Sequence, residues 1–502
     1  MRYALTAVMA KETDRITIEE IGVPSVVLME RAAEAVALKT AEIAALFNRT
    51  VKVLAICGCG NNGADAIAAA RILNWQGLYV DIATVGNEER ATEEYMLQMQ
   101  IALKSGMRVV NISAIPEYDI VIDGMFGIGF KGAVRKEYED IINLINDTRN
   151  IVVSVDVPSG IDATTGALEG VAVKADVTVT FGYIKTGLLQ YPGKLYAGEI
   201  TVTDIGFYPR AVANMNPPMY FTPESIQGIP ERKKDSNKGT YGRLLVIAGS
   251  EDMSGAAYLS AAAAMRSGAG LVEVVTHDRN AELIRKMLPE AIVTGYSTDN
   301  VRDIIGMKLP KSTCIILGPG LSQSDTAKDI VDYVLNNAEI PVIMDADALN
   351  IVSKDISVLK RYSSTVIITP HIGEMTRLTG MSSEKIKADR MKAASDFAQD
   401  NNVIVVMKDA VTVVAEDNSG ERMYINTSGT PAMAKAGMGD VLTGVIAGMY
   451  MLGIEPYSAA AMGTYLHGMG GELAAYDMGE HSVMATDVVD CISRVLNTNK
   501  GS

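Results

Sequence analysis

The sequence has few residues suited to a metal centre or a disulfide framework. Its 502 residues include only four cysteines and four histidines, which are scattered along the chain. A zinc site needs such ligands at close, regular spacing, and a disulfide-stabilised fold needs more cysteines. Both classes are excluded, and we expect free thiols and a reducing compartment.

A leader segment and a membrane span are also missing from the pattern. Residues 1–10 contain no apolar run of signal-peptide length, and Lys11, Glu12 and Asp14 follow at once. The uncharged apolar stretch 441–454 has 14 residues, which is too short to span a bilayer. We therefore predict a cytoplasmic protein without a membrane partner.

Positive charge is in deficit. The 60 acidic residues outnumber the 45 basic ones and give a net charge of −15, which argues against a nucleic-acid or anionic-membrane partner. Phosphate binding stays possible, because the start of a helix supplies positive potential locally. A hydrophobic content of 48% is typical of a globular protein, and the length predicts two to four domains.

Apolar segments alternate with helical patterns in the first half of the chain. The expected helices lie near 26–47, 65–75, 88–104 and 136–146, and the expected strands at 51–56, 79–84, 119–123, 151–155 and 177–181. Continuous apolar strands between amphipathic helices predict an α/β fold with a mostly parallel, doubly wound, Rossmann-like sheet.

A second α/β series follows a proline-bearing segment at 208–230. Its expected strands lie at 243–248, 271–276, 314–317, 342–345, 365–369 and 403–407, followed by a hairpin at 412–415 and 422–425 and a helical region at 436–495. We assign a first domain to 1–212, a linker or crossing segment to 213–237 and a second domain to 238–502.

Residues 434–444, Ala-Lys-Ala-Gly-Met-Gly-Asp-Val-Leu-Thr-Gly, are the most informative stretch. Gly437 and Gly439 precede an apolar helix, whose start leaves backbone N–H groups available for a phosphate. Asp440 adds a carboxylate beside that pocket, which suggests a base that takes a proton from a hydroxyl attacking phosphorus. The alternative is a structural aspartate that caps the helix or interacts with its dipole.

A second group of candidate residues lies at strand ends in the first half. Residues 53–65 predict a strand, a glycine turn and a helix start, a spacing that brings the backbone close to a diphosphate. Asp123 and Asp156 each end a strand before a glycine or proline turn, so their carboxylates are expected in the ligand crevice. Because Val157 and Pro158 follow Asp156, we expect its backbone to be extended.

These residues resemble the YjeF N-terminal family of NAD(P)H-hydrate epimerases, over about 7–207. The resemblance implies that Asp156 contacts the nicotinamide ring as a catalytic residue and that K⁺ binds Asn62, Asp123 and Ser159, whose oxygen donors suit a hard cation. It also implies a set of residues that bind the hydrated dinucleotide: Asn61, Asn62, Gly63, Ala64, Asp65, Gly127, Ile128, Gly129, Phe130, Lys131, Gly132 and Ala133.

The first domain departs from that family at one loop. The family has Gly-Gly-Asp-Gly where this chain has Gly63, Ala64, Asp65 and Ala66, and each alanine is expected to add a methyl near the substrate. The two alanines favour an alternative in which this half is a non-catalytic binding module, like YjeF-type scaffolds in RNA-processing proteins. Asp123 and Asp156 favour an enzyme.

Further motifs follow β-rich runs in the second half and are expected along one rim of its sheet. They are 318–321 (Gly-Pro-Gly-Leu), 345–350 (Asp-Ala-Asp-Ala-Leu-Asn), 369–374 (Thr-Pro-His-Ile-Gly-Glu) and Lys408, whose ammonium could meet a phosphate. With Asp440 they resemble the carbohydrate-kinase-like family of ADP/ATP-dependent NAD(P)H-hydrate dehydratases over about 238–495.

This second resemblance implies a ribokinase-like α/β/α domain, with Gly320, His371 and Asp440 at the substrate. Family members have Lys-Gly where this chain has Lys408 and Asp409, and often Asn in place of Thr430. The implied nucleotide-binding residues are Lys408, Asp409, Ala410, Val411, Thr412, Thr430, Gly437, Met438 and Gly439.

Together the resemblances imply a bifunctional enzyme that repairs hydrated NADH or NADPH. The first domain would exchange the R and S hydrates, and the second would dehydrate the S form with ADP, or ATP, and Mg²⁺, giving AMP and phosphate from ADP. Phosphorylation would turn the ring hydroxyl into a better leaving group. Its partners would be small molecules, and a homo-oligomer is expected. A vitamin-precursor kinase of the same superfamily is a further alternative, although such kinases lack the first domain.

Overall fold

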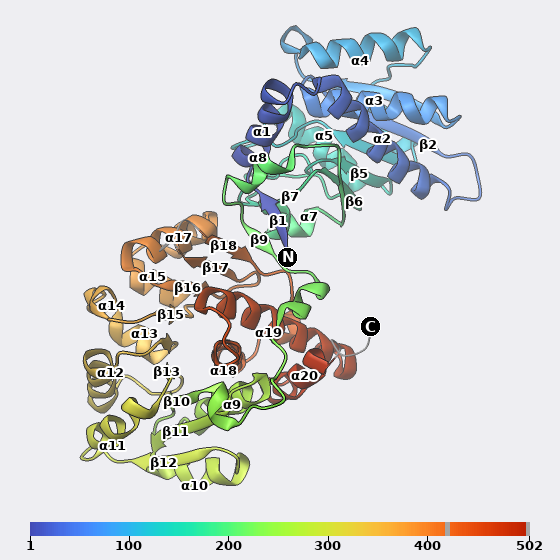
Figure 1. Cartoon of the computed structure of the whole chain (residues 1–502). Coiled ribbons are helices and arrows are strands. Elements are labelled where there is room, and N and C mark those ends of the chain that lie inside the picture. The colour runs from blue at the N-terminus through green and yellow to red at the C-terminus, as the bar shows by residue number, and fades with distance from the viewer. Residues whose placement is uncertain (417–421, 498–502) are drawn as a thin grey trace. The chain divides into compact units, whose positions relative to one another are not determined.

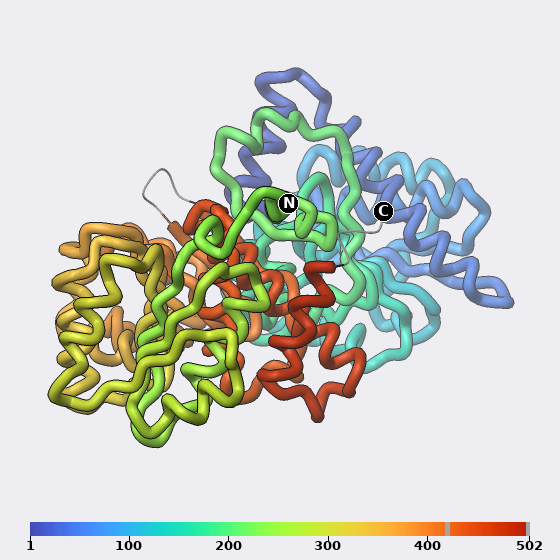
Figure 2. The backbone as a smooth tube through the Cα atoms, turned by 60° about the horizontal axis from the view of Figure 1, so that its bottom comes forward, coloured from blue at the N-terminus to red at the C-terminus, as the bar shows by residue number. Residues whose placement is uncertain are grey.

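The computed structural model describes residues 1–416 and 422–497 (Figure 1). The chain divides into two compact units: an N-terminal unit, Tyr3–Pro218, and a C-terminal unit, Met219–Ser502 together with Met1–Arg2. The junction between them lies inside the segment 213–237. In Figure 2 the tube runs from blue to green through the N-terminal unit and from green to red through the C-terminal unit.

The N-terminal unit is built on a parallel six-stranded sheet in the order β3-β2-β4-β5-β6-β8. From β2 the chain moves outward to β3 and then returns to β4 on the other side of β2. This reversal opens a crevice at the carboxyl ends of β2 and β4, where doubly wound sheets bind ligands. The strands are β2 (Lys52–Gly58), β3 (Tyr79–Val85), β4 (Ile120–Gly124), β5 (Ile151–Val155), β6 (Val177–Phe181) and β8 (Glu199–Thr203).

Helices cover both faces of this sheet, which confirms the predicted doubly wound fold. Along β2, Val53 and Ala55 pack in one core with α2 and α3, whereas Leu54 and Ile56 pack in another with α5, because strand side chains alternate. The helices of the unit are α1 (Ala7–Arg15), α2 (Ser25–Ala44), α3 (Asn61–Trp75), α4 (Glu93–Lys104), α5 (Lys136–Asp147), α6 (Thr186–Leu189), α7 (Gly193–Tyr196) and α8 (Pro209–Ala213). Strand β1 (Arg2–Leu5) pairs with β7 (Ile184–Lys185).

The C-terminal unit contains a longer sheet in the order β12-β11-β10-β13-β14-β15-β16-β17-β18-β9. Neighbouring strands are parallel as far as β16, and the pairs β16–β17 and β17–β18 are antiparallel, so the predicted hairpin is confirmed. The strands are β9 (Met219–Tyr220), β10 (Arg243–Ile247), β11 (Leu271–His277), β12 (Ile292–Tyr296), β13 (Cys314–Leu317), β14 (Val342–Met344), β15 (Val366–Ile368), β16 (Ile404–Met407), β17 (Val413–Glu416) and β18 (Arg422–Ile425).

One face of this sheet shares its core with the helices α9 (Ser254–Ser267), α10 (Asp278–Met287), α18 (Met438–Met451), α19 (Pro456–Met478) and α20 (Ala485–Asn497). The others lie toward the opposite side in Figure 1: α11 (Val301–Lys308), α12 (Asp325–Asn337), α13 (Asp347–Val352), α14 (Ser357–Arg361), α15 (Ile372–Thr379), α16 (Ser383–Ala388) and α17 (Arg390–Asn401).

Small residues fix the position of α18 against the alanine-rich α9. A Cβ atom at Gly444 would lie 2.3 Å from the Ser260 carbonyl oxygen, and one at Gly448 would lie 2.3 Å from Ser267 Cβ. Such close packing holds the amino end of α18 at the sheet edge that carries the predicted motifs. Within the described ranges, no helix is long and apolar enough to cross a membrane.

Candidate active sites

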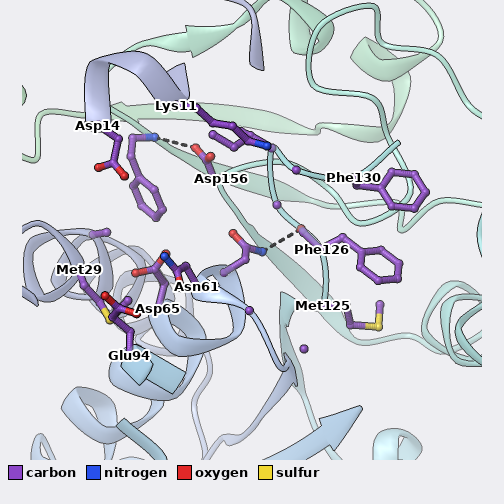
Figure 3. A pocket seen from close by; sticks show the side chains of 18 of the residues that line it. Lys11, Asp14, Met29, Asn61, Asp65, Glu94, Met125, Phe126, Phe130 and Asp156 are labelled. Carbon is purple, nitrogen blue, oxygen red and sulfur yellow. Dashed lines mark hydrogen bonds between the residues drawn. The ribbon is translucent and has the colours of Figure 1, made fainter. Parts of the chain in front are cut away.

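A cavity of about 1370 Å³ lies at the carboxyl ends of the strands in the N-terminal unit (Figure 3). Its wall includes Asn61, Asn62 and Asp65 from the start of α3, the segment 125–130 after β4, and Asp156 after β5. The volume exceeds that of most small-molecule pockets, so the cavity has room for a dinucleotide.

The turn before α3 requires glycine. A Cβ atom at Gly63 would lie 1.7 Å from the Gly58 carbonyl oxygen, and one at Gly58 would lie 2.1 Å from the Met125 carbonyl oxygen. The close approach brings the first turn of α3 to the cavity, with its N–H groups free of intrahelical partners. Gly63 itself is buried and contributes no surface to the cavity wall.

Ala64 and Ala66 do not place methyl groups near the substrate, contrary to expectation. Both are fully buried in α3, in the core shared with α2, and neither lines the cavity. A Cβ at Gly124 would lie 2.4 Å from Ala66 Cβ, so this methyl packs beneath β4. Alanine is compatible with both positions because they are helical.

The predicted K⁺ ligands gather around the main chain of Phe126. Asn62 Nδ2 donates a hydrogen bond to the Phe126 carbonyl oxygen at 2.9 Å, and the Phe126 N–H donates to Ser159 Oγ at 2.9 Å. Ser159 Oγ in turn donates to the fully buried Asp123 carboxylate at 2.6 Å. Burial raises the pKa of Asp123, and the hydrogen bonds from Ser159 and Ser154 oppose this rise.

This donor set fits a hard cation better than a transition metal. Carboxylate, hydroxyl and carbonyl oxygens are all present near Phe126. In the part of the chain that the structure describes, no three His, Cys, Asp or Glu side chains are arranged to hold a metal.

Asp156 has a left-handed rather than an extended backbone, with φ of 64°. The expectation was wrong because a proline restricts the residue directly before it, which is Val157. The Asp156 Oδ1 atom accepts hydrogen bonds from Lys185 Nζ at 2.5 Å, Thr180 Oγ1 at 3.0 Å and the Phe181 N–H at 3.1 Å. Asp156 and Lys185 are both buried, with 7% and 2% of their surface exposed.

Three further carboxyl groups line the same cavity: Asp14, Asp65 and Glu94 (Figure 3). Burial raises the pKa of Asp65 well above its usual value, and the charges of Asp156, Asp14 and Glu94 add to this rise while Lys185 opposes it. Burial and Asp156 also raise the pKa of Asp14. Lys185 is thus a buried ammonium facing several carboxyl groups.

Sequence reasoning identified only part of this cavity. Residues 127–130 line it as expected, whereas Lys131, Gly132 and Ala133 do not. Asp14, Glu94 and Lys185 were missed, because each stands alone in the sequence without a glycine turn or motif beside it.

The C-terminal unit brings its predicted motifs together at the carboxyl edge of the sheet. Lys408 Nζ donates to Asp345 Oδ1 at 2.5 Å, which joins the ends of β16 and β14. A Cβ atom at Gly439 would lie 3.3 Å from Lys408 Nζ and 3.4 Å from Asp345 Oδ2. The ion pair therefore lies directly against the start of α18.

Asp440 lies in the first turn of α18. Burial raises its pKa to about 7; the charge of Asp345 adds to the rise and that of Lys408 opposes it. Gly437 is the N-cap with φ of 87°, and the Met438 side chain is buried, so these residues offer the site their backbone. The result is a carboxyl group of base strength beside unpaired helix N–H groups.

His371 begins α15 through a reciprocal cap with Glu374. The His371 N–H donates to Glu374 Oε2 at 2.8 Å, and the Glu374 N–H donates to His371 Nδ1 at 3.2 Å. Burial raises the pKa of Glu374 to about 7, while burial and Lys408 lower the pKa of His371. The half-exposed imidazole is thus kept neutral at the rim.

Two loops near the Lys408–Asp345 ion pair have restricted backbones. Gly320 has φ of 60°, and a Cβ atom there would lie 2.9 Å from Ala256 Cβ in α9. Ala346, between Asp345 and Asp347, has φ of 50° and ψ of −113°, which is strained for a residue with a side chain. Strain of this kind is typical of residues held in place at functional sites.

The remaining predicted nucleotide-binding residues have structural contacts of their own. Asp409 accepts from Arg390 Nε at 2.8 Å, and Val411 and Thr412 are buried in the segment between β16 and β17. Thr430 Oγ1 accepts from the Ala432 N–H at 3.4 Å, a cap that asparagine also makes. Ala410 lies next to Asp409 in the bend that follows β16.

His467 of α19 was not predicted. Its imidazole is buried, its Nε2 has no hydrogen-bond partner among the described residues, and burial together with Lys408 lowers its pKa to about 4. No motif surrounds it in the sequence.

Comparison with known proteins divides the chain in the same way. Residues 25–187 match the family described as YjeF-related protein N-terminus, and residues 244–494 match the family described as NAD(P)H-hydrate dehydratase. Bifunctional NAD(P)H-hydrate repair enzymes match nearly the whole chain. The one from Moorella thermoacetica is 35% identical over 98% of this chain and 96% of its own length, and the one from Escherichia coli is 32% identical over 88% and 85%.

Solved structures match the C-terminal unit. The ADP/ATP-dependent NAD(P)H-hydrate dehydratase from Bacillus subtilis, co-crystallised with ATP and Mg²⁺, is 36% identical and covers 57% of this chain and all of its own, with a TM-score of 0.51. These similarities confirm the ribokinase-like fold expected for the second half.

Proposed function

The chain belongs to the family of bifunctional NAD(P)H-hydrate repair enzymes, and we propose that its two units divide the two reactions between them. The enzyme epimerises hydrated NADH and NADPH and dehydrates the hydrate with an adenine nucleotide. We assign exchange of the R and S hydrates to the N-terminal unit and dehydration of the S hydrate to the C-terminal unit. The position of Asp440 at the start of α18, beside the Lys408–Asp345 pair, is the observation that carries this assignment.

In the dehydratase site, Asp440 takes the proton from the hydroxyl group of the hydrated ring. The N–H groups at the start of α18 and the Lys408 ammonium stabilise negative charge on the transferred phosphoryl group. Phosphate then leaves with the electron pair of its carbon–oxygen bond, and loss of a proton from the adjacent ring carbon restores the ring double bond. Gly320 and His371 bind the substrate, and the nucleotide lies along 408–412, Thr430 and 437–439.

Mg²⁺ supplies charge neutralisation on the nucleotide phosphates when it is bound. It would be held mostly through the phosphate oxygens of the nucleotide. With ADP as the donor, the products are AMP and phosphate.

In the epimerase site, the first turn of α3 and the segment 127–130 hold the dinucleotide, and Asp156 acts on the hydroxyl-bearing ring carbon. Asp123, Ser159, Asn62 and the Phe126 carbonyl are the residues that would hold K⁺, which would offset the charge of the buried Asp123 carboxylate. These residues also connect to the segment after β4 that lines the cavity.

The alternatives lose their support at particular residues. The scaffold reading rested on Ala64 and Ala66, whose methyls are packed away from the cavity, while Asp65 and Asp156 line it. A vitamin-precursor kinase would have no use for the N-terminal unit. The cytoplasmic location and the homo-oligomeric state are kept as part of this proposal.

The experiment supplies purified enzyme with an R and S mixture of hydrated NADH, Mg²⁺ and either ADP, ATP or no nucleotide. We expect NADH and one phosphate per hydrate with a nucleotide, and only R–S exchange without one. Exchange is expected to fall when K⁺ is replaced by tetramethylammonium. Absence of phosphate release with both nucleotides would contradict the assignment of Asp440.

A further inference from the structure

Lys185 is the most fully buried cation in the epimerase cavity, and it has no counterpart among the predicted site residues. Its Nζ atom donates to Asp156 Oδ1 at 2.5 Å, to the Phe181 carbonyl oxygen at 3.0 Å and to Thr180 Oγ1 at 3.1 Å. These three acceptors use all three protons of the ammonium group. Lys185 is therefore saturated and acts on a substrate through Asp156.

Several carboxyl groups surround the Asp156–Lys185 pair. Asp65 comes from α3, Asp14 from α1 and Glu94 from α4, and all three line the cavity with Asp156. Lys11 of α1 is the other lysine in the wall, but it is exposed. Among the hydrogen bonds and ion pairs of the described residues, none joins it to Asp156. Lys185 is therefore the cation bonded to Asp156 in a cavity wall that carries three further carboxyl groups.

The carboxyl groups of Asp156 and Asp65 thus have different surroundings. Asp156 accepts three hydrogen bonds, one of them from an ammonium, whereas Asp65 has no cationic partner among the hydrogen bonds and ion pairs of the described residues. Burial favours the protonated form of Asp65, whose pKa is raised. Unequal carboxyls of this kind form acid and base pairs in enzymes.

We propose that Lys185 is a positioning residue that keeps Asp156 ionised and oriented, so that Asp156 acts as the base and protonated Asp65 as the acid in epimer exchange. This inference rests on the proposed epimerase function. Lys185 also holds Asp156 in its left-handed conformation, since the pair joins the turn after β5 to β7.

The proton movements balance for a ring carbon that bears a hydroxyl group and a bond to the ring nitrogen. Asp156 accepts the hydroxyl proton as the carbonyl forms and the carbon–nitrogen bond breaks. The electron pair of that bond stays on nitrogen, which takes the proton of Asp65. Ring closure on the other face of the carbonyl returns both protons, so the inverted hydrate leaves an unchanged carboxyl pair.

The test measures exchange of the R hydrate of NADH at pH 5 to 9 without nucleotide, for the full-length wild type, Lys185→Met, Lys185→Gln and Lys185→Arg. In Lys185→Met and Lys185→Gln we expect kcat at pH 7 to fall at least about tenfold, with KM changed little. The acid limb of the plot of kcat against pH should move up by about one to three pH units. Lys185→Arg should keep the limb near that of the wild type. Lys174→Met, which alters an exposed lysine of the same unit, is the control.

Dehydration of the S hydrate by the same samples reports the integrity of the C-terminal unit. The single tryptophan, Trp75 of α3, reports folding of the N-terminal unit. A folded neutral variant with an unchanged pH profile would overturn the proposal, as would Lys185→Arg losing as much activity as Lys185→Met. A wild type without exchange would instead overturn the epimerase function itself.

Discussion

Asp440 carries a negative charge in surroundings that oppose it. Burial and Asp345 raise its pKa to about 7, close to neutral pH. A base with a pKa near the working pH combines availability with driving force for proton transfer. The same desolvation that makes Asp440 effective should also lower the stability of the fold.

Replacing Asp440 with Asn is expected to abolish nucleotide-dependent dehydration while R–S exchange continues. In the wild type, kcat/KM for dehydration should rise between pH 6 and pH 8, because the carboxyl group ionises in this range. Phosphate release and NADH absorbance measure dehydration, and chromatography of the hydrates measures exchange. Loss of both activities would contradict the division between the units.

The stability effect of this substitution has a definite sign. The folded chain retains a proton on Asp440 between the ordinary value of 3.8 and about 7, and the unfolded chain releases it. The group's contribution to stability therefore falls as pH rises through this window, until the desolvated charge is fully present. The free energy of unfolding of Asp440→Asn, relative to that of the wild type, should be about 2 kcal/mol greater at pH 8 than at pH 5. Calorimetry measures this difference. Asp299→Asn, at an exposed position of the same unit, should show no such difference.

At the scale of elements, α3 combines a binding role at its first turn with a structural role in its interior. Asn61, Asn62 and Asp65 line the cavity, while Ala64 and Ala66 pack into the core one residue away. The departure from the family's glycines therefore lies on the side of the helix that faces the protein.

The double variant Ala64→Gly, Ala66→Gly, which restores the family's loop sequence, is expected to be less stable and equally active. Each change removes a buried methyl and loosens a helix interior, so the loss should be about 1–2 kcal/mol per site. Trp75 fluorescence during urea unfolding measures it. An increase in exchange rate of several fold would show that the alanines obstruct the substrate.

The interior strands could be predicted from sequence, because burial on both faces leaves continuous apolar runs. Strand β5 has the predicted bounds, and β2, β4, β10 and β16 differ by one or two residues. The edge strands β8 and β12 were not predicted, since half-exposed residues interrupt their apolar runs, whereas the edge strand β3 was predicted to within one residue. The predicted helix 88–104 is interrupted because Thr92 caps a new helix at Glu93.

The candidate sites were predictable to the extent that they depend on local chain geometry. Gly437, Gly439 and Asp440 lie within one turn, and their spacing alone indicates an anion pocket with a base. The Asp156–Lys185 pair joins residues 29 positions apart through β6 and β7, and only the folded sheet brings them together. The left-handed backbone of Asp156 in the turn after β5 was likewise not indicated by the sequence.

For the whole molecule, the residues of each proposed site belong to one unit. The residues around the epimerase cavity all come from the N-terminal unit, and Asp345, His371, Lys408 and Asp440 all come from the C-terminal unit. We therefore expect neither reaction to use a side chain from the other unit. The two activities should therefore be separable by single substitutions and recoverable from separate molecules.

A mixture of Asp156→Asn and Asp440→Asn chains is expected to repair a full R and S mixture of hydrated NADH when ADP and Mg²⁺ are present. Asparagine suits position 156 because it tolerates the left-handed backbone. Asp156→Asn alone should stop once the S hydrate is consumed, and Asp440→Asn alone should form no NADH. In the mixture, R hydrate inverted on one chain diffuses to the dehydratase site of another, so NADH should reach the wild-type end point. If the R hydrate persisted in the mixture while the wild type consumed it, the hydrate would have to pass between the units of one chain.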